Sequence, residues 1–179
     1  MLKYFKIAIS KVTLQSVSVW FLVAVFVGLI AFVLYRNDKI DLKSFITLPV
    51  FAFYLSFVAT ITIVARNPSQ IARYELIPFW SYRAIAEGKT ILISEVFWNF
   101  VLFIPIGILF MLILSCKHKW IVSIACGSLL SSSIEVIQLI SHRGLFEFDD
   151  IIHNTLGTVI GIGIFLFINK AGKRLIGKI

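Results

Sequence analysis

The sequence predicts an all-α fold, a polytopic α-helical integral membrane protein with about five transmembrane helices in one bundle. Of its 179 residues, 59% are hydrophobic and only 15% are charged, whereas soluble domains are typically about 45–50% apolar and about 25% charged. The mean hydropathy is +0.97, and five stretches approach the ~20 apolar residues that cross a bilayer. One water-soluble core could not bury so much apolar surface. This excludes a soluble enzyme, a disordered chain and a disulfide-stapled secreted module.

The expected spans cover residues 12–35, 45–65, 91–115, 120–140 and 151–168. The first span follows Lys3, Lys6 and Lys11, as the apolar part of a signal sequence would. Its apolar run is too long for a signal peptide and lacks a small-residue cleavage site, so we expect an uncleaved helix. We expect a single membrane domain over residues 1–179, in which residues 1–65 form the two N-terminal helices.

The longest loop, residues 66–90, combines aromatic and cationic side chains, which suits the headgroup layer of a membrane. These side chains are Tyr74, Phe79, Trp80 and Tyr82 with Arg66, Arg73, Arg83 and Lys89. We expect this amphiphilic segment to lie along the interface or to enter the mouth of the bundle. An ordinary interfacial connector is the alternative.

The chain carries a net charge of +8, and such an excess in a membrane protein usually faces anionic lipid headgroups. Membrane lipids are therefore expected partners. Nucleic acid is not, because no basic run stands clear of the bilayer. Lys and Arg residues divide almost equally between the loops of the two sides, so their number does not fix the orientation. The basic tail, with Lys170, Lys173, Arg174 and Lys178, favours a cytoplasmic C-terminus, whereas the N-terminal lysines favour the reverse.

Polar residues of the fourth span recur at steps of three, four and three residues and so share one helix face. They are Ser128, Ser131, Glu135 and Gln138. Because a carboxylate in lipid is costly, this stripe should face other helices or a water-filled cleft. Interhelical hydrogen bonding is the alternative role. Asn99, which shares a face of the third span with Glu95, could hydrogen-bond Glu135 or Gln138 or make one purely structural hydrogen bond.

The fifth span begins with a similar face, made of Asp150, Asn154, Gly157 and Gly161. Its two glycines form a GxxxG motif, which allows another helix to approach closely. This face predicts tight packing, with Asp150 and Asn154 presented at the mouth of the bundle. Asp150 could also serve only to complement the helix dipole in the first turn.

Residues 141–150 join the fourth and fifth spans and bring further charge near Glu135. The loop contributes His142, Arg143, Glu147, Asp149 and Asp150. Crowded carboxylates raise one another's pKa values, so this rim could hold a general acid/base pair. We expect no metal and no cofactor, because the spacing of histidines and carboxylates matches no known metal motif. Cys116 and Cys126 are interpreted as small apolar residues. No nucleophile elbow, P-loop or HExxH motif is present.

Four blocks of the sequence, taken in order, resemble the motifs of the VanZ-like family. They are Arg73-Tyr-Glu-Leu-Ile-Pro-Phe79, then Asn99-Phe-Val-Leu-Phe-Ile-Pro-Ile-Gly107, then Ser132-Ser-Ile-Glu-Val-Ile-Gln138, then Arg143 with Asp150-Ile-Ile-His-Asn-Thr-Leu-Gly157. They lie within about residues 73–161. Two features depart from the family pattern. Glu75 stands where the family usually has Asn, and two spans precede the first block where the family's namesake has one.

The resemblance implies a role in low-level resistance to teicoplanin, because the family is named for an accessory protein of glycopeptide-resistance clusters. The leading hypothesis is thus a multi-pass protein of the bacterial cytoplasmic membrane that protects the cell envelope at its outer face. The expected partners besides membrane lipids are a lipoglycopeptide antibiotic or a lipid-linked cell-wall precursor. The residues expected to bind such a ligand are Arg73, Asn99, Gln138, Arg143 and Asn154.

Two other functions stay open from the same residues. A membrane enzyme could act on a lipid-linked wall precursor, with Glu135 and Asp150 as its acid/base pair. Alternatively, the polar residues could only specify helix packing in a non-enzymatic scaffold. Charge-neutral substitution of Glu135 and Asp150 separates these hypotheses, because it should abolish acid/base chemistry and matter little to a scaffold.

Overall fold

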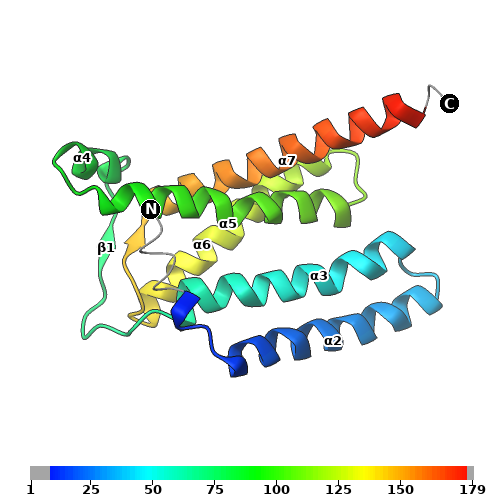
Figure 1. Ribbon diagram of the computed structural model, residues 1–179, viewed down its shortest axis with the longest axis horizontal. Coiled ribbons are helices and arrows are strands. Elements are labelled where there is room, and N and C mark those ends of the chain that lie inside the picture. Colours follow the sequence, from blue (N-terminus) through cyan, green and yellow to red (C-terminus); the bar gives the residue numbers. More distant parts are fainter. Residues whose placement is uncertain (1–8, 177–179) are drawn as a thin grey trace.

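The computed structural model describes residues 9–176, so Lys3, Lys6 and Lys178 lie outside the described residues. Five helices in the described part are long and apolar enough to cross a membrane. They are α2 (Leu14–Arg36), α3 (Leu42–Ala59) continued by the π-helix η1 (Thr60–Val64), α5 (Ile91–Ile113), α6 (Lys119–Ile140) and α7 (Phe148–Ile176) (Figure 1). The predicted all-α, multi-pass membrane fold is confirmed.

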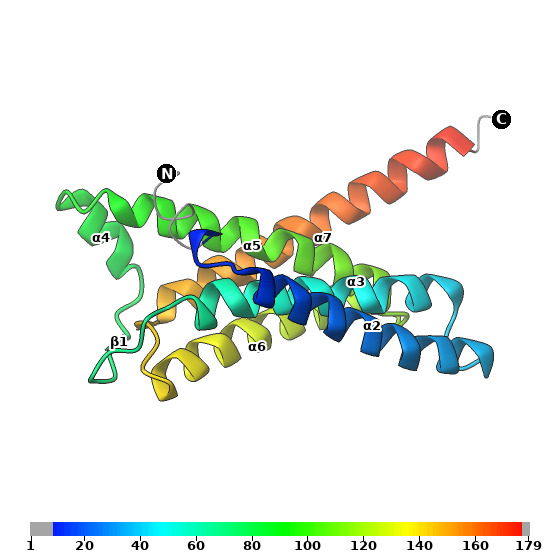
Figure 2. The ribbon, with the colours of Figure 1, turned by 60° about the horizontal axis from the view of Figure 1, so that its bottom comes forward.

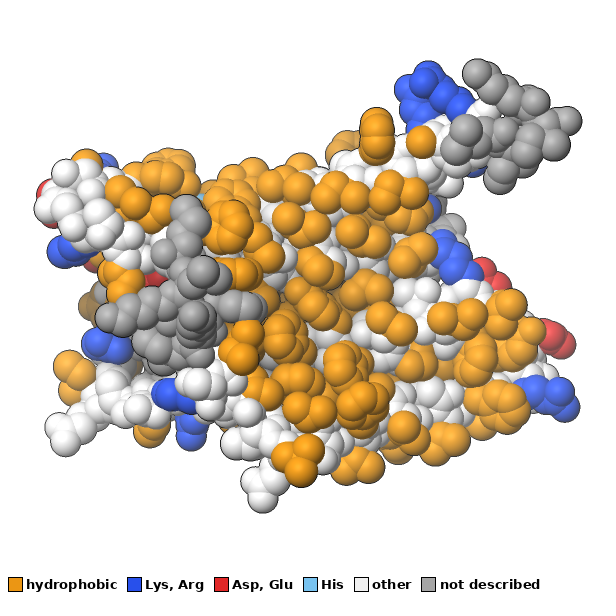
Figure 3. Space-filling view, viewed as in Figure 1, with side chains coloured by type: hydrophobic (Ala, Val, Ile, Leu, Met, Phe, Trp, Pro, Cys, Tyr) orange, Lys and Arg blue, Asp and Glu red, His pale blue; other side chains and the backbone are white. Residues whose placement is uncertain are grey.

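Helix α5 is the centre of the bundle, and α2 joins the bundle through α3. Helices α2 and α3 form an antiparallel pair, α3 packs against α5, and α5 packs against both α6 and α7. The buried core lies where α3, α5 and α6 meet, and consists of Val58, Leu102, Phe103, Ile106 and Ile134. Figure 3 shows hydrophobic side chains covering the middle of the bundle and charged side chains gathered toward its two ends. This distribution fits a protein whose middle is solvated by hydrocarbon.

Glycines bring α5 and α7 into close contact. A Cβ added at Gly157 or Gly161 would overlap the backbone carbonyl of Phe100 or Ile104, respectively. A Cβ added at Gly163, by contrast, would have no described atom within 4 Å apart from those of its own stretch of helix. The tight packing predicted from the GxxxG motif is thus confirmed, and its partner is α5.

The connections between helices divide between the two ends of the bundle. Residues 9–13, 65–90 and 141–147 lie at one end, which we call the loop end (Figures 1 and 2). Residues 37–41, 114–118 and the C-terminal end of α7 lie at the other. The segments that precede α5 and α7 therefore share one membrane face, although they are far apart in the sequence.

The segment 66–90 holds more structure than an interfacial loop. Strand β1 (Tyr74–Glu75) pairs in parallel with β2 (Phe146–Glu147), and the short helix α4 (Trp80–Ala86) follows. A strand of two residues is too short to show the alternation on which sequence prediction depends. Helix α7 also begins at Phe148, earlier than residue 151, because acidic residues suit the first turn of a helix.

Candidate functional site

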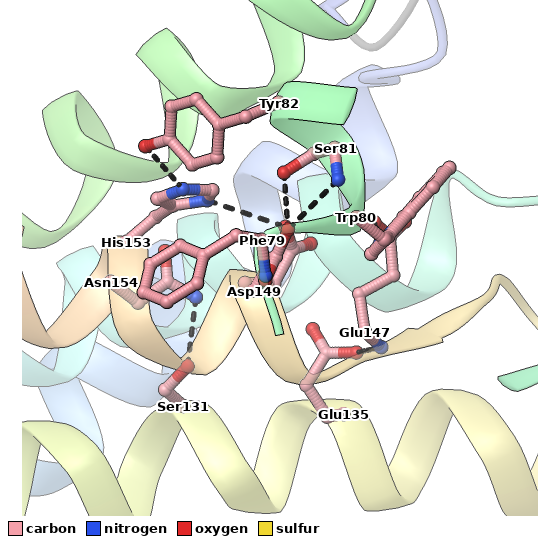
Figure 4. A network of polar contacts seen from close by, with 11 residues as sticks. Phe79, Trp80, Ser81, Tyr82, Ser131, Glu135, Glu147, Asp149, His153 and Asn154 are labelled. Carbon is pink, nitrogen blue, oxygen red and sulfur yellow. Dashed lines mark hydrogen bonds and ion pairs between the residues drawn. The ribbon is translucent and has the colours of Figure 1, made fainter. Parts of the chain in front are cut away.

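Asp149 organises the loop end from the first turn of α7, where it is 0% exposed. Its Oδ1 accepts a hydrogen bond from the Phe79 N–H at 2.5 Å, and its Oδ2 accepts from the Ser81 N–H at 3.0 Å and from the Ser81 hydroxyl (Figure 4). These donors lie at the N-terminus of α4, where the helix dipole favours a negative charge. Phe79 has a φ of 62°, so Asp149 also holds a turn that a phenylalanine rarely adopts. The carboxylate thereby ties α4 to α7.

A second contact between α4 and α7 joins the Tyr82 hydroxyl to His153 Nε2 at 2.9 Å (Figure 4). His153 is buried against the rings of Tyr82 and Phe100, and its Nδ1 lies 4.0 Å from Asp150 Oδ1. Burial and the charge of Asp149 raise the pKa of Tyr82, so the phenol keeps its proton and can donate it to the imidazole. Both contacts fix the position of α4 over the start of α7.

Two side chains from α6 and the following loop bind the backbone where the second span ends. Gln138 Nε2 donates to the carbonyl of Thr62 at 3.0 Å. Arg143 Nη1 donates to the carbonyls of Val64 at 3.1 Å and Arg66 at 3.2 Å. The last carbonyls of a helix have no partner within it, and a cation near them also complements the dipole. The π-turn and the chain that leaves it are thus held against α6.

Arg66 lies at the centre of a cluster of carboxyl groups. Its guanidinium interacts electrostatically with all of them, and they are Glu95 of α5, Glu135 of α6, Glu147 of β2 and Asp150 of α7. Gly144, with a φ of 147°, makes room for this arginine, because a Cβ there would lie 2.7 Å from Arg66 Nη1. Carboxyl groups from four elements of the fold therefore converge on one cation.

Glu147 links this cluster to α4. Its N–H donates to Glu135 Oε2 at 2.9 Å, and its own Oε2 accepts from Trp80 Nε1 at 3.1 Å (Figure 4). Burial, and after it the charge of Asp150, raises the pKa of Glu147 to about 9. The Glu147 side chain is therefore an uncharged carboxylic acid at neutral pH, which can both accept and donate a hydrogen bond.

A cavity of about 380 Å³ opens among these groups at the loop end, a size typical of ligand pockets. Its charged lining consists of Lys11, Arg66 and Arg73 with Glu95 and Glu147. Its apolar lining includes Ile61, Trp80, Leu92 and Leu145. Lys11 is held at the rim, where its Nζ donates to the Ala65 carbonyl at 2.7 Å and to Asn67 Oδ1 at 3.2 Å. The cavity thus offers cations and an apolar wall to a ligand at the membrane surface.

The residues predicted for binding lie in different places. Arg73 lines the cavity, whereas Gln138 and Arg143 bind the backbone described above. Asn154 is buried in the bundle, where its Nδ2 donates to Ser131 Oγ at 2.9 Å. Asn99 makes a hydrogen bond with Asp150 rather than the expected one with Glu135 or Gln138. Ligand binding by these five residues stays a prediction.

The proposed acid/base pair is brought together, because the charges of Glu135 and Asp150 interact. Glu135 is only 1% exposed and lies behind Glu147. The stripe predicted on α6 points inward, with Ser131, Glu135 and Gln138 all buried. Within residues 9–176, no three His, Cys, Asp or Glu side chains are grouped as metal ligands would be.

Sequence reasoning did not single out Arg66, Lys11 or Asp149 as site residues. Arg66 and Lys11 flank apolar spans, where a cation normally needs no explanation beyond the lipid headgroups. Asp149 was one carboxylate among several in its loop. The one available signal was that Arg66 directly follows a span whose neighbours in the bundle carry carboxylates.

Comparison with known proteins adds one finding to this geometry. The model of the VanZ/LLP1 family matches residues 20–169. That match includes all five spans in whole or in part and both segments of the loop end that precede α5 and α7. No curated protein and no solved structure matches the chain.

Proposed function

Because the chain belongs to the VanZ/LLP1 family, we propose that it protects the cell envelope of a bacterium against lipid-tailed glycopeptides such as teicoplanin. The protein acts from the cytoplasmic membrane, with the loop end at the outer face. The observation that carries this proposal is the cavity of about 380 Å³ at one membrane face, where cations stand beside an apolar wall.

Such a cavity suits an amphiphile with a charged head and an acyl tail. Arg73 is exposed and lines the cavity, and a guanidinium binds carboxylate or phosphate through two parallel hydrogen bonds. The apolar residues Ile61 and Leu92 lie at the ends of neighbouring spans, so an acyl chain leaving the cavity would enter lipid directly. Vancomycin, which lacks such a tail, would gain less from this arrangement.

The test compares the susceptibility of a sensitive Gram-positive host to teicoplanin and to vancomycin. The host expresses the intact protein, Glu135→Gln or Glu87→Gln at matched membrane levels. Glu87 is an exposed residue at the C-terminal end of α4, so its variant controls for the loss of one carboxylate at the same membrane face. Selective protection against teicoplanin that is lost only in Glu135→Gln supports the proposal. Equal or absent protection against both antibiotics contradicts it.

The buried carboxyl cluster favours a second candidate function, an enzyme acting on a lipid-linked cell-wall precursor. Glu135 and Asp150 would exchange a proton, and the carboxyl group of Glu147, which interacts with both and lines the cavity, could deliver a proton to a bound substrate. The purified protein should then convert such a precursor, detected by mass spectrometry, and Glu135→Gln and Asp150→Asn should abolish turnover. A scaffold would show no turnover, and its partner binding would survive both substitutions.

A further inference from the structure

We propose that the cavity at the loop end binds the phosphate group of a lipid headgroup, held by Lys11, Arg66 and Arg73. The inference rests on the proposed function in that it concerns the same cavity and the same kind of ligand, an anionic head with an acyl tail, and it names phosphate as the head group. Both the electrostatics and the shape of the cavity point to this ligand.

The wall of the cavity carries more positive than negative charge. Three cations line it against two carboxyl groups, and one of these, Glu147, is uncharged at neutral pH because its pKa is raised to about 9. Glu95 and the deeper carboxyl groups offset part of the positive charge of Arg66. Lys11 and Arg73, however, have no carboxylate partner within the described residues. The rim therefore attracts an anion.

The three cationic side chains can act together as hydrogen-bond donors to one phosphate group. Lys11 precedes α2, whereas Arg66 and Arg73 lie at the two ends of the connection between η1 and β1, so the cations reach the cavity from two segments of the loop end. A phosphate presents several terminal oxygens and can accept hydrogen bonds from two guanidinium groups and an ammonium together. Glu147 can add a fourth hydrogen bond, because an uncharged carboxyl group donates to a phosphate oxygen without repelling it.

The apolar part of the cavity wall favours a lipid phosphate over free phosphate. Apart from Asn67, the uncharged lining is mainly apolar, with Ile61 and Leu145 beside Leu92 and Trp80. This apolar wall lies at the boundary of the spans that end at Val64 and begin at Ile91. A lipid would place its phosphate among the cations and its first acyl carbons against these side chains, where burial of each CH₂ is favourable. Free phosphate would leave that wall without a ligand.

The experiment measures binding to the full chain purified in a neutral detergent. The probes are dihexanoyl phosphatidic acid, dihexanoyl phosphatidylcholine, sodium decanoate and inorganic phosphate. Isothermal titration calorimetry measures the binding of each probe. The variants are Arg73→Gln and Lys11→Gln, because both side chains are exposed and their loss should leave the bundle folded. Lys170→Gln is the matched control, since Lys170 is exposed near the opposite end of the bundle.

We expect phosphatidic acid to bind at least tenfold more tightly than phosphatidylcholine, whose choline cation opposes the rim, and than decanoate. Arg73→Gln and Lys11→Gln should each weaken this binding about tenfold, and Lys170→Gln should leave it unchanged. Inorganic phosphate that competes at equal concentration would assign the site to free phosphate, and the phosphate chemistry would stand. Equal binding of all three amphiphiles, or unaltered binding by both rim variants, overturns the inference.

The same variants keep this inference apart from the proposed function. If Arg73→Gln loses phosphatidic acid binding but protects against teicoplanin as well as the intact protein does, the phosphate site stands and its part in protection is refuted. If protection is lost in Arg73→Gln while both rim variants bind phosphatidic acid as the intact protein does, the cavity serves protection through a different ligand, and the phosphate assignment is overturned.

Discussion

Replacing Asp149 with asparagine tests how the loop end is held together. The carboxylate accepts hydrogen bonds from two backbone N–H groups, of Phe79 and Ser81, and from the Ser81 hydroxyl. An asparagine keeps one acceptor oxygen and turns an NH₂ group toward the other donors. At least one buried donor then loses its partner, which costs about 1–3 kcal/mol, and the surviving hydrogen bond loses the charge that strengthened it. Together these losses weaken the attachment of α4 to α7 by about 3 kcal/mol. The equilibrium constant for the opening of α4 should therefore rise about a hundredfold.

The assay is the labelling rate of a cysteine at position 84. Ala84 is 4% exposed on the inner face of α4, so Ala84→Cys reacts with a maleimide only when α4 opens. Cys116 is exposed and Cys126 is partly exposed, and both are first replaced by serine or alanine. In this background Asp149→Asn should label about a hundredfold faster than the parent. Glu87→Gln, which removes an exposed carboxylate from the same helix, should label within twofold of it. A rise of less than threefold in Asp149→Asn would refute the anchoring role.

Two further outcomes follow from the packing and the charges. Gly161→Ala should lower the stability of the purified protein by about 2 kcal/mol, because the added methyl group overlaps the Ile104 carbonyl. Gly163→Ala, in open space on the same helix, should be neutral in the same denaturant titration, and equal effects would contradict the close packing. The pKa of Glu147 is raised from 4.5 to about 9. Between these pH values the folded protein keeps a proton that the unfolded chain releases. The stability that this carboxyl group contributes is therefore lost as the pH rises from about 4.5 to about 9. Thermal stability should therefore fall across that range, and Glu147→Gln should flatten the slope by up to about 1.4 kcal/mol per pH unit, whereas parallel curves would disprove the uncharged state.

Much of the bundle could be predicted because each part of it reflects a local rule. The five spans follow from runs of apolar residues that only lipid can solvate. The inward face of α6 follows from the spacing of Ser131, Glu135 and Gln138, since a carboxylate is unstable against lipid. The close approach of α7 to another helix follows from Gly157 and Gly161, which present no side chain.

The candidate site could be predicted only in part. The carboxyl groups of Glu135 and Asp150 were expected to be neighbours, and their charges do interact. The expected ligand contact of Arg143 stays a prediction, and the structure adds a role that the sequence did not indicate, since its guanidinium binds the backbone of Val64 and Arg66. A backbone carbonyl that needs a donor is invisible in the sequence until the end of its helix is known. Here η1 sets that end by a π-turn that no periodicity predicts.

Local patterns in the amino-acid sequence are enough to identify a multi-pass helical membrane protein, the helix faces that point inward, and the motif residues that resemble the VanZ-like family. The folded arrangement was needed to show that α5 packs on α7, that Asp149 holds α4, and that Arg66 stands among four carboxyl groups. The physical reason is the range of the interactions. Hydropathy and helical spacing act within one segment, whereas Asp149 and Ser81 are 68 residues apart. Such distant pairs meet only through the paths of residues 65–90 and 141–147, which no local pattern fixes.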